Sequence, residues 1–148
     1  MRNDVEAEEV LFTVQPAINL MKDGGTVVII GSTASIQPPT GMSLYGGAKA
    51  ALRTMVRAWI QEVRGTGIRI NVLSPGAVDT PSLRSALADA SGADAVDALV
   101  TEMGEGNPLG RLAQPRELGT AAVFLASEAS SFITGVELFA DGGMAQTG

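Results

Sequence analysis

Three side chains in this sequence have the types and spacing needed for proton transfer. Tyr45 and Lys49 stand four residues apart, a separation that places both on one face of a helix, and Ser32 precedes Tyr45 by thirteen residues. A phenol with a pKa of about 10 is a poor acid–base group at neutral pH, and a neighbouring ammonium lowers that pKa because it favours the phenolate. A serine hydroxyl nearby could polarise a carbonyl oxygen. Together the three residues predict proton exchange with a carbonyl or hydroxyl oxygen.

The composition removes most other catalytic chemistries. The 148 residues include no cysteine and no histidine, which excludes thiol nucleophiles, thiolate metal sites, histidine acid–base catalysis and the usual zinc sites. Ten basic against sixteen acidic residues give a net charge of −6, so nucleic acid is not an expected partner. No segment resembles a membrane span or a signal peptide. We therefore expect a cytoplasmic protein whose residues 1–148 form a single domain.

Helical and strand patterns alternate along the chain and position the three side chains. Residues 26–30 are β-branched without polar alternation, which is typical of a strand covered on both faces. Ser32 follows this strand after one glycine, at the strand end where open α/β sheets bind ligands. Tyr45 and Lys49 begin a long helix over 43–64, and its apolar stripe consists of Leu44, Ala48, Leu52, Met55, Trp59 and Val63.

The remaining patterns complete an α/β fold. Further helices are expected over 5–22, 82–90, 92–103 and 115–127, and further strands over 68–73 and 135–140. Strands separated by helices predict right-handed crossovers and therefore a sheet of three parallel strands with flanking helices. A sheet this small is expected to leave an edge without a partner strand.

The joint pattern resembles the classical short-chain dehydrogenase/reductase family. The interval from Ser32 to Tyr45, the Tyr-x-x-x-Lys and the Asp-Gly-Gly of 141–143 fall in the order that this family uses. The resemblance runs from about residue 9 to 143 and implies the C-terminal half of a Rossmann-like, doubly wound parallel sheet. The supporting stretches are GTVVIIGSTAS, SLYGGAKAAL, GIRINVLSPGAVDTP, NPLGRLAQPREL and AAVFLASEASSFITGVELFADGG.

The resemblance also implies roles for individual residues. Tyr45 would be the general acid–base, Lys49 would lower its pKa and bind the nicotinamide ribose, and Ser32 would orient the substrate oxygen. Residues 81–107 would form a mobile lid over an alcohol or ketone substrate. Asn71 is expected to support the end of its strand, with a direct role as the alternative. The implied cofactor is NAD or NADP, and the residues expected to bind it are Tyr45, Lys49, Pro75, Gly76, Val78 and Thr80.

Part of the family pattern is missing from this sequence. A full-length member has a leading strand followed by T-G-x-x-x-G-x-G, whose glycines let the backbone approach the cofactor diphosphate, and this motif does not occur here. The pair Gly46-Gly47 is similar only in composition, because it lies inside a helix beside Tyr45. The family's fourth catalytic residue, an asparagine, falls on Glu6, with Asn3 three residues earlier. We therefore expect a truncated domain that lacks the cofactor-binding half.

Two functions of different classes remain open. The first is an NAD(P)-dependent oxidoreductase that is inactive as this isolated chain, with a Tyr/Lys epimerase or dehydratase as a weaker variant. The second is a non-catalytic remnant that assembles with full-length relatives, because the family's helices equivalent to 5–22 and 43–64 pack against a partner subunit. In either case we expect a homo-oligomer or association with such relatives. The sequence names neither the substrate nor the choice between NAD and NADP.

Overall fold

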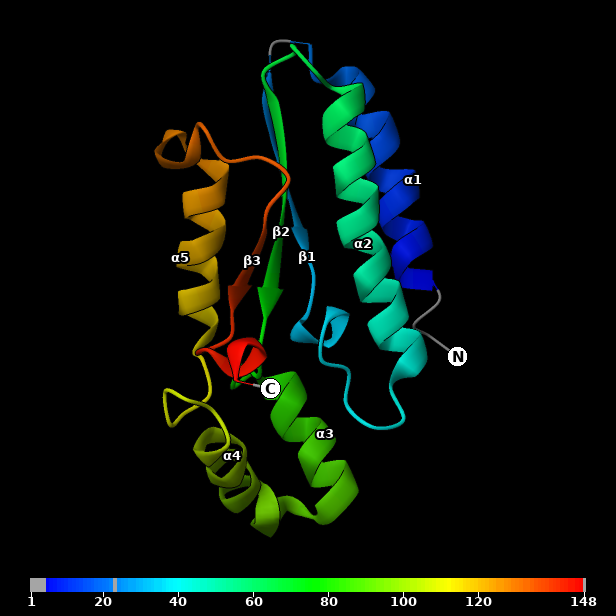
Figure 1. Ribbon diagram of the computed structural model, residues 1–148. Coiled ribbons are helices and arrows are strands. Elements are labelled where there is room, and N and C mark those ends of the chain that lie inside the picture. The colour runs from blue at the N-terminus through cyan, green and yellow to red at the C-terminus, as the bar shows by residue number, and fades with distance from the viewer. Residues whose placement is uncertain (1–4, 23, 148) are drawn as a thin grey trace.

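The computed structural model describes residues 5–22 and 24–147 as alternating helices and strands (Figure 1). The expected order of elements is confirmed, and most boundaries agree within a few residues. Short 3-10 helices occupy Thr33–Ser35 (η1), Ala93–Ala95 (η2), Glu128–Ser130 (η3) and Met144–Gln146 (η4). The helices are α1 (Val5–Leu20), α2 (Ser43–Glu62), α3 (Pro81–Ser91), α4 (Val96–Glu105) and α5 (Pro115–Ala126), and the strands are β1 (Gly25–Ile30), β2 (Ile68–Pro75) and β3 (Glu137–Ala140).

The sheet has the predicted three parallel strands. Their order is β1-β2-β3, with Ile29 paired to Val72 and Pro75 paired to Ala140. Helices α1 and α2 cover one face, and α5 covers the other (Figure 1). Among the described residues β1 pairs with β2 alone, so its outer edge has no partner strand, as expected. The chain therefore forms part of a doubly wound α/β sheet, with all three carboxyl ends at one edge.

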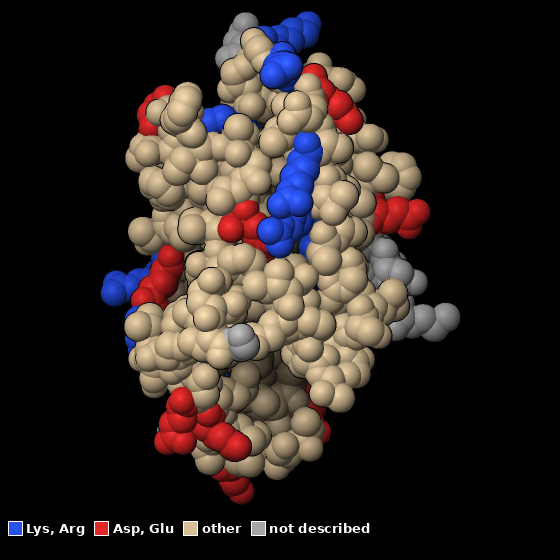
Figure 2. Space-filling view, in the orientation of Figure 1, with Lys and Arg blue, Asp and Glu red and all other residues tan. Residues whose placement is uncertain are grey.

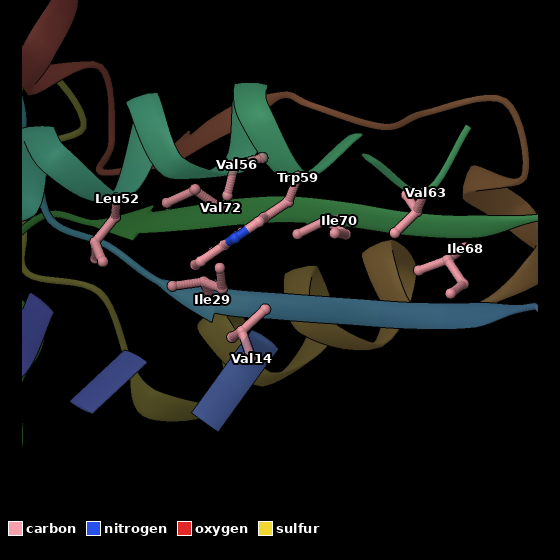
Figure 3. Packing of buried hydrophobic residues seen from close by; sticks show 9 residues of the cluster. All are labelled: Val14, Ile29, Leu52, Val56, Trp59, Val63, Ile68, Ile70 and Val72. Carbon is pink, nitrogen blue, oxygen red and sulfur yellow. The ribbon is translucent and has the colours of Figure 1, made fainter. Parts of the chain in front are cut away.

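The core lies between the sheet and the pair of helices α1 and α2 (Figure 3). Most of the predicted apolar stripe of α2 faces it, but Leu44 is 56% exposed. The reason is local: the first turn of α2 packs on η1 through Gly46, and Leu44 lies on the opposite side of that turn. The buried cluster consists of Val14, Ile29, Leu52, Val56, Trp59, Val63, Ile68, Ile70 and Val72.

Two polar residues of β2 fix the chain that leads into β3. Asn71 is fully buried, and its amide donates to Ile133 O at 3.0 Å while it accepts from Val136 N at 3.1 Å. Arg69 donates to Leu125 O and Ser127 O, both at 3.0 Å, and so binds carbonyl groups at the end of α5. Both hydrogen-bonding groups of the Asn71 amide are therefore used for structure, which confirms the expectation that it supports its strand.

The start of α5 is held by a charged pair. Arg111 donates to both carboxylate oxygens of Glu117, at 2.8 and 2.7 Å, and the backbone N–H of Gln114 donates to the same carboxylate at 2.7 Å. These donors lower the pKa of Glu117 from 4.5 to about 2, and the hydrogen bonds from Arg111 make the largest contribution to the shift. A carboxylate whose pKa is lowered by folding stabilises the folded chain above its unfolded pKa and loses that contribution as the pH falls.

We therefore expect Glu117→Gln to change the acid response of the chain. Glutamine keeps an oxygen for the Gln114 N–H but loses the charge that pairs with Arg111. The melting temperature of the parent should exceed that of the variant at pH 6, and the difference should vanish between pH 4.5 and about 2. Thermal unfolding followed by circular dichroism across this range measures the difference. If the difference in melting temperature stays constant or widens as the pH falls, the ion pair between Glu117 and Arg111 does not stabilise the fold in this way.

Candidate active site

The predicted helical pair is formed. Tyr45 and Lys49 lie in the first two turns of α2, and the Lys49 ammonium nitrogen is 5.6 Å from the centre of the Tyr45 ring. The same nitrogen donates to Ile30 O, the last carbonyl of β1, at 3.4 Å. Both side chains are half-buried. The ammonium therefore lies between the phenol ring and the end of β1.

Ser32 begins the turn that follows β1. Its hydroxyl oxygen accepts from Ala34 N at 3.2 Å and caps η1. This turn packs closely on α2, because a β-carbon added at Gly46 would lie 2.8 Å from Ala34 O and 2.7 Å from Pro38 Cβ. No larger residue fits at that position without a shift of the backbone. Gly46 thus allows the serine-bearing turn and the tyrosine-bearing helix to approach each other.

The importance of Gly46 was missed from the sequence. Its signal was a glycine immediately after Tyr45 in the middle of an amphipathic pattern, where glycine costs helix stability and needs a packing reason. The pair Gly46-Gly47 resembles the glycine-rich cofactor motif in composition only, and that comparison gave no reason to expect close packing. Gly47 has open space around it, so only the first of the two glycines makes a close approach.

The ends of β1 and β2 are also in close contact. Gly31 N donates to Leu73 O at 2.8 Å, and a β-carbon at Gly31 would overlap the Ser74 hydroxyl. The loop that follows β2 therefore leaves the sheet at the same edge as Ser32. Carboxyl ends of adjacent parallel strands form the ligand-binding edge of open α/β sheets.

Four of the residues expected to bind a cofactor, Pro75, Gly76, Val78 and Thr80, lie at the end of β2 and in the loop that follows it. Pro75 ends β2, and a β-carbon at Gly76 would lie 2.9 Å from Asp141 Cβ, so glycine is required there. Val78 forms an isolated parallel bridge with Ala113. The Thr80 hydroxyl accepts from Leu83 N at 3.1 Å and caps α3, so its side chain has a structural task. The loop is thus braced along its length at one edge of the sheet.

Helices α3 and α4 stand beyond this edge as a separate lobe. Figure 2 shows the surface hollowed between the lobe and the body of the molecule, with acidic side chains gathered over the lobe. Arg84 of α3 binds Asp79 of the loop after β2 at 2.6 and 3.0 Å, and Asp97 of α4 at 2.8 Å. The Arg84 hydrogen bonds lower the pKa of Asp79. One guanidinium therefore links the loop to both helices of the expected lid.

The remaining candidate groups are a fourth catalytic residue, a metal site and a membrane-spanning helix. Asn3 and the side chain of Glu6, the candidates for the fourth catalytic residue, lie outside the described part of the chain. Across residues 5–22 and 24–147 no cluster of acidic side chains could hold a metal ion. None of the helices in this same portion has the length and apolar character needed to cross a bilayer. The chemistry that the described site offers is proton transfer by a phenol beside an ammonium.

Known proteins match nearly the whole of this chain. A family model described as enoyl-(acyl carrier protein) reductase matches residues 2–145. The chain is 40% identical over 138 residues to oxidoreductase asL5 of Sarocladium schorii, covering 92% of this chain and 52% of that protein. It thus spans about half the length of the curated relatives it matches.

Solved structures extend the likeness to the whole described fold. A short chain dehydrogenase family protein from Francisella tularensis superposes with a TM-score of 0.88 at 26% identity, covering 96% of this chain and 60% of that one. The angucycline C-6 ketoreductase LanV with bound NADP gives a TM-score of 0.81 at 27% identity, covering 96% and 52%. The sequence match over 2–145 and these superpositions establish that the chain belongs to the short-chain dehydrogenase/reductase family.

Proposed function

We propose that this chain carries the proton-transfer part of an NAD(P)-dependent oxidoreductase acting on an alcohol or ketone. The observation that supports this most is the Lys49 ammonium held between the Tyr45 ring and Ile30 O at the carboxyl edge of the sheet. LanV, a structural neighbour, is a ketoreductase with bound NADP. In this proposal residues 1–148 form a single, truncated domain.

When bound, the nicotinamide would supply the hydride for reduction of a carbonyl carbon. The Tyr45 hydroxyl would donate its proton to the carbonyl oxygen of the substrate. In oxidation, the phenolate takes the hydroxyl proton back. Lys49 stabilises the phenolate with its positive charge, and Ser32 donates a hydrogen bond that orients the same oxygen. The carbonyl would thus gain one hydride from the cofactor and one proton from Tyr45.

The cofactor would lie along the loop that carries Pro75, Gly76, Val78 and Thr80. Close packing of Gly76 on Asp141 fixes the path of this part of the loop. The sequence contains no T-G-x-x-x-G-x-G, so the diphosphate has no glycine-rich cradle in this chain. A second segment, covalently joined or separate, would have to supply it.

The isolated chain should consequently bind NAD(P)H very weakly. We expect no saturable binding by isothermal calorimetry below a Kd of about 1 mM, which corresponds to about −4 kcal/mol. Both NADH and NADPH serve as titrants, with each oxidised form as a comparison. A micromolar Kd for either would show that the residues present here bind the cofactor without the missing motif.

Tyr45→Phe tests the chemistry once a cofactor-binding half from a relative restores activity. The substitution removes the proton donor and keeps the ring, so kcat should fall by about 10²–10⁴. Lys49→Ala should also lower kcat severely, whereas Leu44→Ala, at an exposed neighbouring position, should have little effect. Unchanged Trp59 fluorescence confirms folding in each variant. Activity of Tyr45→Phe within a few-fold of the parent refutes the assigned role.

A second function, assembly with another subunit, is favoured by the exposed edge of the sheet. Ile30 is 52% exposed, and a groove of about 400 Å³ runs between α1 and β1. Its lining is largely apolar and includes Val10, Val27 and Val28. The unpaired N–H and C=O groups of an edge strand favour pairing with another chain. This surface fits a strand of a relative or of a second copy.

We therefore expect the pure chain to be a dimer or larger, or to aggregate, at micromolar concentration. Ile30→Lys places a charge on the edge and should shift the chain towards monomer. Phe132→Ser removes a fully exposed aromatic side chain away from that edge and serves as the control. Light scattering after size-exclusion chromatography measures the mass. A sharp, cooperatively melting monomer of 15.2 kDa would contradict the proposal.

A further inference from the structure

Glu137, the first residue of β3, is a buried acidic residue that the sequence analysis did not single out. Its side chain is only 4% exposed. One carboxyl oxygen, Oε1, accepts from the Ser35 hydroxyl at 2.6 Å and from the Ser74 hydroxyl at 2.7 Å. The other oxygen, Oε2, is buried and has no hydrogen bond within the described chain; Arg53 Nε is its ion-pair partner at 3.7 Å.

Two of these partners belong to the elements that carry the proposed catalytic residues. Ser35 closes η1, the turn capped by Ser32, and Ser35 N donates to Ser32 O at 3.0 Å. Arg53 lies four residues after Lys49 on α2, so the two share the helix face of Tyr45. A single carboxyl group therefore contacts both the serine-bearing turn and the tyrosine-bearing helix.

Stability alone does not explain an acidic residue at this position. Burial of a carboxyl group is costly, and well-packed apolar residues in place of buried ion pairs are often neutral or stabilising. On the same face of β2, Ile70 and Val72 are buried and apolar, whereas Ser74 is polar and donates to Glu137. Glu137 instead ties four separate elements together: η1, α2, β2 and its own strand.

We propose that Glu137 is a positioning residue that fixes the Ser32 turn against the Tyr45 helix. The catalytic part of this inference rests on the proposed function, while the coupling between Glu137 and the turn does not. The hydrogen bond from Ser35 connects the Glu137 carboxyl group to the turn, and the ion pair with Arg53 connects it to α2. The hydrogen bond from Ser74 holds the same carboxyl group on β2. Loss of the Ser35 contact should free the turn and leave the sheet intact.

Hydrogen exchange measured by NMR on the chain itself tests the coupling. Ser35→Ala and Ser74→Ala are matched variants, because each removes one hydroxyl from the same oxygen of Glu137. In Ser35→Ala the amides of Ser35 and Ile36 should exchange about tenfold faster, while the Val72 amide of β2 is unchanged. In Ser74→Ala the two turn amides should keep their parent rates within about twofold. Equal acceleration in both variants, or none in either, overturns the proposal.

Substitutions of Glu137 itself give a second readout. Glutamine keeps an oxygen that accepts both hydroxyls, so Glu137→Gln should retain slow exchange in the turn, and Glu137→Leu should not. In an enzyme restored with a cofactor-binding half, Glu137→Leu should lower kcat by about 10- to 100-fold with little change in the KM of the cofactor. Glutamine should rescue most of this loss. A parallel rise in KM with unchanged kcat contradicts positioning.

The two proposals fail separately. If no partner half restores activity, the proposed function fails, while the exchange rates of Ser35→Ala and Ser74→Ala still decide whether Glu137 holds the turn. If Tyr45→Phe abolishes a restored activity but Glu137→Leu leaves kcat unchanged, the function stands and the positioning role is refuted. If Glu137→Leu does not fold, as Trp59 fluorescence will report, the serine pair alone gives the answer.

Discussion

Close backbone contact at the carboxyl edge of the sheet is the constraint on which the site depends. Gly31 lies against Ser74 where β1 and β2 end, and Gly46 lies against Ala34 where α2 meets the following turn. A β-carbon at either glycine would push two elements apart. Without these approaches the Ser32 turn and the Tyr45 helix could not share one edge. The lysine contact to Ile30 O depends on the same geometry, since it spans from α2 to the end of β1.

The sequence alone predicted the strands, the helices and the side chains that share one helix face, because these depend on residues close together in the chain. The β-branched run of 26–30 and the helical spacing of Tyr45 and Lys49 gave the correct strand, helix and shared face. Glu137 was not predictable in this way, because Ser74 and Ser35 are 63 and 102 residues away from it. A glutamate in a short edge strand looks like an ordinary outward-facing charge. The contacts that bury it exist only after three strands and a helix have met.

The two faces of the sheet differ in completeness. Between the sheet and the α1–α2 pair, Trp59 and its neighbours form a closed core, and β2 is buried almost throughout (Figure 3). On the side of α5, Leu125 is fully buried, whereas Val123 is 68% exposed. Domains of this architecture need both faces covered, because parallel strands are apolar on each side. Exposed apolar side chains include Ile30 at the β1 edge and Val123 and Phe124 on α5.

The shared guanidinium of Arg84 has a mechanical consequence. Asp79 belongs to the loop after β2, and Asp97 belongs to α4, yet both are bound to one side chain. Arg84 thereby joins helix α3, helix α4 and the loop after β2 through hydrogen bonds. When α3 moves relative to the sheet, the two hydrogen bonds from Arg84 to Asp79 must break, or the loop after β2 must move with the helix.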